Sequence, residues 1–470
     1  MTDPHDALDT LLTESNSDDQ GQDLRPAEYA DDALALRFTQ RHADDLRYVS
    51  AWNSWLRWDG TRWRVDKTLE AFDLARRIAR QASGELVGYD KTDKLATAVG
   101  SAKTVAAIER LARADRFHAS DTDIWDQDPW LLNTPGGTVN LRSGGLRSHH
   151  RDDAITKVTA VTPEGDCPQW CAFLDTVFRG DRELIAFVRR MLGYSLTGSI
   201  RDHALFFLHG TGGNGKGVLL NTWHRIMGEY SCIAGMETFV ATKGERHPTD
   251  LAMLRGARVV IAQETEDGQR WAESRIKALT GGDPISARLM RQDFFTFEPV
   301  FKLMIAGNHR PSLRNVDEAV RRRFHLVPFE VTIPREQRDP NLPEKLRAEW
   351  PGILAWAIEG CVEWQRIGLA PPAAVLLATE SYLAEEDAIG RFLDDRCDLD
   401  ETGEVEEVQE LFASWRDWCT TVGEYPGSTR QFSQKLEARG LERVRHPVNR
   451  RKSFRGIRLT VRAAGGDHVV

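Results

Sequence analysis

Four short runs of apolar residues between residues 205 and 329 are the clearest pattern in the chain. They cover 205–208, 257–263, 301–307 and 324–329, and each consists mainly of aliphatic or aromatic side chains. Short runs with few polar interruptions are typical of parallel strands that are buried on both faces. The pattern therefore predicts an α/β domain built around a parallel sheet.

Helical spacing is found before these runs. Apolar residues recur every three or four positions from Asp31 onward and over 69–82, 94–113 and 170–196, which predicts amphipathic helices. A hairpin is predicted at 52–63 about an Asp-Gly turn, and short strands with tight turns at 130–141. The tryptophans of the hairpin could stack nucleic-acid bases, but packing inside the hairpin is the more common use.

Residues 371–470 show a different order of elements. Helices are predicted at 405–422 and between the cap Ser428 and Gly440, followed by strands at 441–446 and 453–461 around the basic turn 449–452. Helix, helix and hairpin is the order of a winged helix. We therefore expect four parts: a disordered acidic tail at 1–30, an α+β domain at 31–165, the α/β core with its preceding helices at 166–370, and a linker with a winged-helix-like DNA-binding domain at 371–470.

A glycine-rich loop directly follows the first apolar run. Its glycines would let backbone N–H groups approach a polyphosphate, and its lysine would add a charge at a helix N-terminus that already favours anions. The alternative is a chance glycine-rich turn, but the strand before the loop and the helical pattern after it favour the G-x-x-x-x-G-K phosphate loop. The residues expected to contact phosphate are Gly210, Thr211, Gly212, Gly213, Asn214, Gly215, Lys216, Gly217 and Val218.

Polar residues follow two of the other runs. The second run is expected to be a parallel strand that neighbours the first. Glu264 and Glu266 come after it, where ligands bind in open α/β sheets. Glu264 is expected to hold Mg²⁺ through water or to polarise the attacking water, with Glu266 as the second choice. Asn308 ends the third run and is placed to orient that water. The alternative for these residues is a solvated strand end.

Two further residues bear on phosphate chemistry. Arg323, in the cluster 321–323, is expected to project from the edge of the core and to stabilise charge on a phosphoryl group bound to a neighbouring subunit. A basic helix end is the alternative. Gly217 occupies the place where Ser or Thr normally offers a hydroxyl to Mg²⁺, which puts the usual metal contact in question. Lys216 is expected to face solvent until a nucleotide arrives.

Composition narrows the class of protein. The 470 residues are 41% hydrophobic and 28% charged, as in ordinary soluble proteins. No apolar run approaches the roughly 20 residues that span a bilayer, and the polar N-terminus is unlike a signal sequence, so we expect a cytoplasmic protein. The net charge of −9 does not exclude nucleic acid, because the stretch 443–462 is basic and contains no acid.

The cysteine pattern favours a reducing compartment. The six cysteines are scattered, which argues against a disulfide framework. Cys167 and Cys171, with His149 and His150 upstream, form only a weak zinc pattern, and ordinary packing is the better interpretation.

Taken in order, the phosphate loop, the acid-ended strand, the Asn-ended strand and the Arg-Phe pair resemble superfamily 3 helicases, the AAA+ DNA helicases of small viruses, phages and plasmids. The stretch 276–288 resembles the segment that leads to the DNA-binding hairpin of the phage and plasmid primase-helicase family. The stretches 131–138 and 191–198 resemble the pre-helicase domain of that family. The resemblance covers about residues 35 to 460 and implies the helicase part without a primase-polymerase domain.

This resemblance implies an ATP-dependent DNA helicase with ATP and Mg²⁺ as cofactors. It implies a homo-hexamer in which Lys216, Glu264 and Asn308 of one subunit meet Arg323 of the next, with a separate primase as a further partner. A replication initiator or loader that uses ATP only for assembly is the main rival, and a P-loop kinase would leave Asn308 and the winged helix unexplained. The residues expected to contact single-stranded and duplex DNA are Lys277, Arg288, Arg291, Arg430, Lys435, Arg450, Arg451, Lys452 and Arg455.

Overall fold

A computed structural model describes residues 26–87, 92–241, 249–263, 268–290, 293–313, 316–399 and 404–460 of the chain. Most of the tail predicted at 1–30 thus lies outside the described residues.

The chain divides into two compact units. The first holds residues up to Pro129 together with Asn133–Thr138 and Leu146–Val158, and the second holds Trp130–Leu132, Val139–Gly145 and the chain from Thr159 onward.

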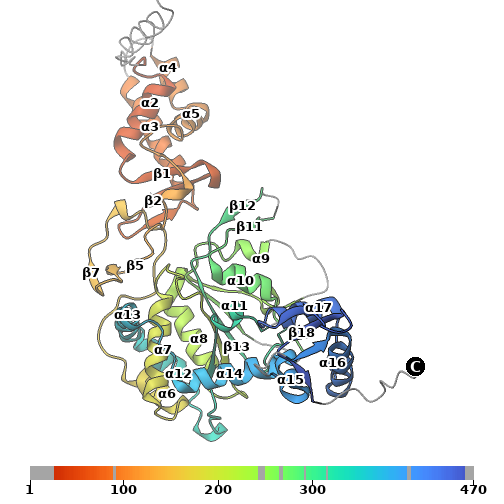
Figure 1. The fold of residues 1–470 in the computed structure, drawn as a ribbon. Helices are drawn as coiled ribbons and strands as arrows, with labels where there is room; N and C mark the ends of the chain where they lie inside the picture. Colours follow the sequence, from red (N-terminus) through yellow and green to blue (C-terminus); the bar gives the residue numbers. More distant parts are fainter. Residues whose placement is uncertain are drawn as a thin grey trace, which may run out of the picture. The chain divides into compact units, whose positions relative to one another are not determined.

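A five-stranded parallel sheet forms the centre of the second unit (Figure 1). Its order is β14-β8-β13-β10-β9, and every neighbouring pair is parallel. The predicted α/β class with a parallel sheet is therefore confirmed, and the four apolar runs are its strands β8, β10, β13 and β14. The strands are β8 (Leu205–His209), β9 (Ser231–Ile233), β10 (Val259–Gln263), β13 (Lys302–Gly307) and β14 (Phe324–Pro328).

The order of the strands differs from expectation at one point. We expected β10 to lie next to β8, but β13 lies between them. All six residues of β13 are buried, as a strand in the middle of a covered sheet requires. The carboxyl end of β13 is therefore the direct neighbour of the glycine-rich loop.

Helices cover both faces of this sheet (Figure 1). The helices of the second unit, apart from the C-terminal elements, are α6 (Pro168–Val177), α7 (Arg182–Ser195), α8 (Lys216–Met227), α9 (Thr249–Ala252), α10 (Glu273–Gly281), α11 (Glu318–Arg321), α12 (Leu342–Ala348), α13 (Trp350–Ile367) and α14 (Ala373–Glu386). Alternate residues of β8 enter different cores: Phe206 packs in the cluster that includes α7, α8 and α13, and Phe207 in the cluster that includes α10 and α14.

Helices α7 and α13 cross at very close range. A side-chain carbon placed on Gly193 of α7 would lie 2.6 Å from the carbonyl oxygen of Ala357 in α13. A carbon on Gly360 of α13 would lie 2.7 Å from the carbonyl carbon of Arg189 in α7. Since the obstacles are backbone atoms, the two glycines set the distance between these helices.

The first unit is an α+β assembly. Its sheet has the order β3-β2-β1-β4, and the predicted hairpin is β2-β3, with Trp55 and Trp63 buried as packing residues. The helix predicted at 94–113 is wrong in extent. It breaks at Gly100 into two helices, and the hydroxyl of Ser101 accepts from the N–H of Thr104 to start the second. The elements are α2 (Asp31–His42), β1 (Leu46–Val49), β2 (Ser54–Trp58), β3 (Trp63–Val65), α3 (Glu70–Leu86), α4 (Asp93–Val99), α5 (Ala102–Ala112) and β4 (Ala119–Ser120).

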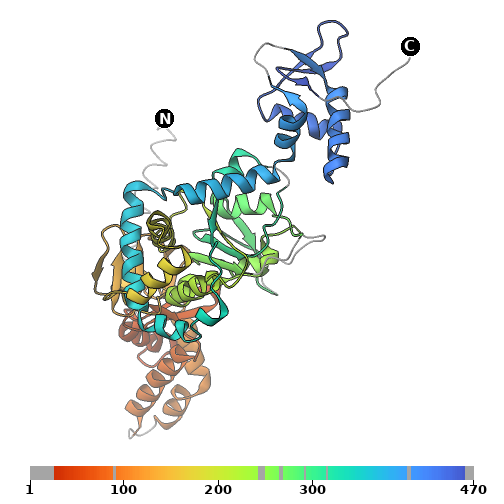
Figure 2. The same ribbon diagram turned by 90° about the horizontal axis from the view of Figure 1, so that it is seen from below.

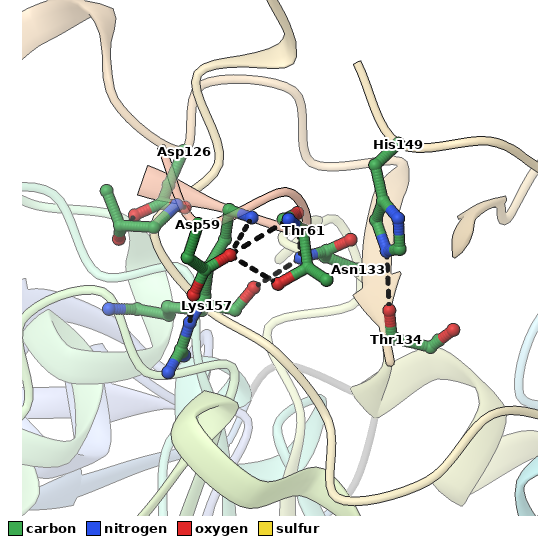
Figure 3. Close-up of polar contacts among 9 residues, drawn as sticks. Asp59, Thr61, Asp126, Asn133, Thr134, His149 and Lys157 are labelled. Atoms are coloured by element: carbon green, nitrogen blue, oxygen red, sulfur yellow. Dashed lines mark hydrogen bonds and ion pairs between the residues drawn. The ribbon is translucent and has the colours of Figure 1, made fainter. Parts of the chain in front are cut away.

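A buried polar network joins distant segments of the first unit (Figure 3). Asn133 donates from Nδ2 to the carbonyl oxygens of Thr61 at 3.0 Å and Lys157 at 3.1 Å. His149 Nε2 lies 2.8 Å from the carbonyl oxygen of Thr134. These contacts give the Asn133 side chain a structural role within the predicted stretch 130–141. That stretch forms β5 (Leu131–Thr134) and β6 (Gly137–Asn140), which share a sheet with β7 (Gly145–Arg147).

The C-terminal elements contain the predicted helix, helix and hairpin, with three changes. The stretch expected as a linker after residue 370 is helical, because it forms α14 and α15, and the strand predicted at 453–461 divides into β18 and β19. Residues 405–407 were expected to be helical but form β16, which pairs with β18. The predicted cap is confirmed, because Ser428 and Gln431 form a reciprocal capping box. Figure 2 shows these elements gathered as one group. They are α15 (Ala388–Arg396), β15 (Cys397–Asp398), β16 (Val405–Glu407), α16 (Val408–Val422), α17 (Thr429–Glu437), β17 (Glu442–Arg445), β18 (Lys452–Arg455) and β19 (Arg458–Leu459).

Among the described residues, no helix combines the length and the apolar character that crossing a membrane would need.

The close crossing of α7 and α13 can be tested by stability. We expect Gly193→Ala to lower the free energy of unfolding by about 1–3 kcal/mol, because the added methyl group meets backbone that cannot move aside. Gly84→Ala in α3 is the control: nothing lies within 4 Å of the new carbon, and alanine should add about 0.5–1 kcal/mol there. Calorimetry of the full chain would measure both. A Gly193→Ala protein as stable as the parent would contradict the close crossing.

Candidate phosphate-binding site

The loop between β8 and α8 has the backbone shape that its glycines permit. Gly212, Gly213 and Gly215 have φ angles of +104°, +62° and +89°, in the region where other residues are strained. A side-chain carbon on Gly215 would lie 2.6 Å from Val177 Cγ1. A carbon on Gly210 would collide with Asn214 and Phe329. The loop is therefore a cradle that side chains at these positions would fill or deform.

Lys216 begins α8 and is held inside the loop. Its Nζ donates to the carbonyl oxygen of Gly210 at 2.7 Å, to Asn214 Oδ1 at 3.1 Å and to Asn308 Oδ1 at 3.0 Å. The residue is only 6% exposed, so the expectation that it faces solvent is wrong. Burial lowers the pKa of Lys216 to about 8 from its ordinary 10.5. The lysine is thus a cation that is poorly solvated and held by neutral oxygens.

Asn308 follows β13 and reaches the same lysine. Because β13 pairs directly with β8, the two carboxyl ends meet at one edge of the sheet. The predicted proximity of Lys216 and Asn308 is found in the structure, and the role of Asn308 toward water stays a prediction. Glu264 and Glu266 lie outside the described residues. Strand β10 ends at Gln263, whose Nε2 donates to Asn221 Oδ1 at 3.1 Å.

Two other loop residues were expected to contact phosphate. Gly217 has open space around it, since nothing lies within 4 Å of a carbon placed there. Val218 is partly buried and packs against the core cluster of α7, α8 and α13. The Cβ of a residue at position 217 would therefore displace no other atom, and the apolar side chain of Val218 offers no polar group to a phosphate.

The segment after β14 closes against the loop. Asn214 donates from Nδ2 to the carbonyl oxygen of Phe329 at 3.1 Å, and the N–H of Ile333 donates to the carbonyl oxygen of Gly213 at 3.0 Å. Sequence reasoning missed this segment, because its polar, proline-containing pattern indicates only a surface loop. The contacts tie the loop to chain that follows β14.

Arg323 does not lie where the sequence led us to expect it. Its side chain is 8% exposed, with Nε donating to Thr280 Oγ1 at 3.2 Å and Nη1 to the carbonyl oxygen of Ala319 at 2.7 Å. Burial lowers the pKa of this guanidinium. The prediction that Arg323 projects from the core edge is therefore wrong for this structure. Arg321 pairs with Glu380 at 2.7 Å, and Arg322 is the exposed member of the cluster.

The predicted DNA contacts of the core fall on two different elements. Lys277 of α10 pairs with Asp317, the N-cap of α11. Arg288 follows β11 (Ile285–Ala287), and its guanidinium carbon lies 4.9 Å from the ring centre of Phe294, just before β12 (Phe295–Phe297). Arg291 lies outside the described residues. These positions gather a cation and an exposed aromatic ring at one hairpin.

The C-terminal candidates divide into paired and exposed cations. Arg451 pairs with Glu407 at 3.1 Å, and Arg455 pairs with Glu442 at 2.7 Å. Lys435 lies half-buried on α17. The exposed members with no ion pair among the described residues are Arg430, Arg450 and Lys452.

Metal ligands are not clustered in the part of the chain that the structure describes, where no three His, Cys, Asp or Glu side chains are grouped to hold an ion. Cys167 is buried and Cys171 is exposed. Burial raises the pKa of Cys167 to about 12, so this thiol keeps its proton at neutral pH.

Two family matches cover much of the chain. Residues 35–179 match the family described as D5 N terminal like. Residues 208–323 match a family described as of unknown function (DUF5906), and this second match spans the glycine-rich loop and Asn308.

Viral proteins named as candidate helicases are similar in sequence. Protein 022R of Frog virus 3 (isolate Goorha) is 26% identical over 300 residues, covering 58% of this chain and 30% of that protein. L207/L206 of Acanthamoeba polyphaga mimivirus is 23% identical over 319 residues, covering 62% and 33%. Protein 184R of Invertebrate iridescent virus 6 is 23% identical over 487 residues, covering 83% and 49%. This chain thus spans less than half the length of each.

Among solved structures, the apo C terminal region of NrS-1 is similar in fold at 11% identity. The match covers 90% of this chain and 99% of that chain, with a TM-score of 0.48. A second structure, the A form of the same region, covers 87% and 95% with a TM-score of 0.46.

The two neighbouring arginines should differ in their effect on stability. We expect Arg323→Ala to cost about 1–3 kcal/mol, because Thr280 and Ala319 lose a buried charged donor. Arg322→Ala, the matched control on an exposed side chain, should change stability by less than about 0.5 kcal/mol. Thermal unfolding of both variants measures the difference. Equal melting temperatures would show that Arg323 is not held as described.

Proposed function

We propose that this protein is an ATP-dependent DNA helicase of a viral, phage or plasmid replication system. The observation that carries the proposal is the convergence of Lys216 from the glycine-rich loop and Asn308 from β13 at one edge of a parallel sheet. We propose that the parallel sheet, with β13 between the loop strand and β10, is an AAA+ core of the superfamily 3 kind, as the resemblance of the sequence implies. The names of the viral relatives support the same function.

The site fits a nucleoside triphosphate. Loop N–H groups and the positive end of α8 would bind the β and γ phosphates together with Lys216, whose ammonium would exchange neutral oxygens for charged ones. Asn308, released from Lys216, would orient the attacking water. Mg²⁺ would neutralise phosphate charge when bound, held by water beside Gly217 and by Glu264 or Glu266.

A ring assembly would complete the site. An arginine from a neighbouring subunit stabilises charge on the transferred phosphoryl group in enzymes of this kind, and a homo-hexamer would supply one at each interface. Arg323 is the residue that the resemblance implies, whereas Arg322 is the exposed one. The ATPase rate of Arg322→Ala, a variant expected to fold normally, would show which of the two acts on the neighbour.

DNA would be bound by the C-terminal elements and by the β11–β12 hairpin. We propose that α16, α17 and the β17–β18 hairpin form a winged-helix-like domain whose exposed Arg430, Arg450 and Lys452 contact phosphates. Arg288, next to Phe294, would meet the strand inside the ring. The substrates are then single-stranded and duplex DNA.

One observation favours the alternative function, a replication initiator or loader that uses ATP for assembly on DNA without processive unwinding. Gly217 supplies no hydroxyl to the metal, and a weak metal contact suits slow turnover better than processive motion. Hydrolysis and strand displacement separate the two functions.

The proposal is tested by strand displacement on a forked duplex. We expect the full chain to displace the strand with ATP and Mg²⁺ but not with a non-hydrolysable analogue. Lys216→Ala should reduce ATP hydrolysis by about 10²-fold or more, in the range of other electrostatic deletions, while remaining folded. Displacement with the analogue, or ATP binding without displacement, would favour the loader.

The depressed pKa of Lys216 makes nucleotide affinity depend on pH. In the free protein the lysine loses its proton above about pH 8, and phosphate binds only the charged form. Affinity for a fluorescent ATP analogue should therefore fall as pH rises from about 8 to 9.5, approaching tenfold per pH unit.

Lys216→Arg is the control for this profile, because arginine stays charged throughout the range. Its affinity should be nearly independent of pH, even if it is weaker than that of the parent. Parallel profiles of the two proteins would mean that Lys216 does not titrate in this range.

A further inference from the structure

The guanidinium of Arg338 lies directly against the glycine-rich loop. A side-chain carbon placed on Gly213 would lie 2.8 Å from Cζ of Arg338, so the guanidinium occupies the space that a side chain at this position would enter. Arg338 donates from Nε to the carbonyl oxygen of Ile333 at 2.9 Å. This bond helps to hold the planar end of the side chain beside Gly213.

The backbone around Arg338 is anchored to the same loop. The N–H of Ile333 donates to Gly213, as described above, and the N–H of Arg338 donates to the carbonyl oxygen of Arg335 at 3.3 Å, closing the 3-10 turn Arg335–Gln337. The guanidinium therefore belongs to the loop's own subunit and is carried by a short, tied segment.

The charge of Arg338 is not neutralised by the described residues. Among the described residues, no carboxylate lies within ion-pair distance of the Arg338 guanidinium. Asp339, the next residue, pairs with Lys345 at 2.6 Å. Arginine presents donors in a planar fork that matches phosphate oxygens. An exposed, uncompensated fork beside a phosphate cradle is an anion-binding group.

We propose that Arg338 is a second phosphate-binding cation of this site, acting within one subunit beside Lys216. This inference rests on the proposed nucleotide site and deepens it. The two cations differ in kind, since Lys216 is enclosed and held by neutral oxygens whereas Arg338 is exposed and approaches the loop from the segment after β14. Together the two cations would bind the polyphosphate from two sides of the loop.

The test compares the full chain with Arg338→Ala, Arg338→Lys and Arg335→Ala. Arg335 is an exposed cation on the same turn and is the matched control. Binding of a fluorescent ATPγS analogue with Mg²⁺ should weaken about tenfold or more in Arg338→Ala, the loss of one charged hydrogen-bonding group. Arg338→Lys should retain part of the affinity, and Arg335→Ala should bind like the parent.

A second readout separates phosphate binding from a structural role. Without nucleotide, the melting temperatures of Arg338→Ala and the parent should agree, and only the rise in melting temperature on adding ATPγS should shrink. Equal affinities of Arg338→Ala and Arg335→Ala, or a lower melting temperature that alone accounts for weaker binding, would overturn the inference. A parent protein that binds no nucleotide would overturn the proposed function instead.

Discussion

The buried ammonium of Lys216 is the interaction on which the site depends. A charge removed from water is costly unless hydrogen bonds replace its hydration. The chain supplies three oxygens, from Gly210 at the loop start, Asn214 within the loop and Asn308 after β13. Satisfying one cation thereby joins strand, loop, helix and a second strand at one edge of the sheet.

In the free site, the hydrogen-bonding capacity of the Lys216 ammonium is therefore met by the protein's own oxygens. At the proposed site a phosphate would displace neutral oxygens from Lys216, because charged acceptors bind an ammonium more strongly than amides do. Asn308 is the one of the three acceptors that is exposed, and it follows another strand. At the proposed site, nucleotide binding would change the environment of Asn308 and so would link occupation of the loop to the residue proposed to orient the attacking water.

The sheet could be predicted from the sequence because buried parallel strands are short, apolar and bounded by polar residues. The order of the strands could not, since a strand's own pattern does not identify its neighbours. The single helix expected at 94–113 is interrupted at Gly100, because the side chain of Ser101 caps the start of a second helix there. The prediction of a helix at 405–407 was wrong because of a distant contact and not a local one: these residues pair with β18, and this pairing overrides their helical spacing.

Within the site, the nearness of Lys216 and Asn308 was predictable from topology, because both follow parallel strands. The burial of Arg323 was not. Three consecutive arginines at the end of the short helix α11 leave no periodicity from which to choose the inward side chain. The approach of Arg338 to Gly213 depends on the path of an irregular segment, which no local pattern encodes.

The ion pairs of the C-terminal hairpin bear on how its charge could be used. Arg455 is bound to Glu442 with both side chains exposed, and such pairs contribute only about 0–1 kcal/mol and weaken with salt. Arg451 is bound to Glu407, whose side chain is only 15% exposed, so this pair is less open to solvent. Breaking the Arg455 pair to contact a phosphate backbone would cost little, since counterion release drives such contacts. At the DNA interface proposed above, Arg455 would therefore be available to a polyanion together with the exposed cations.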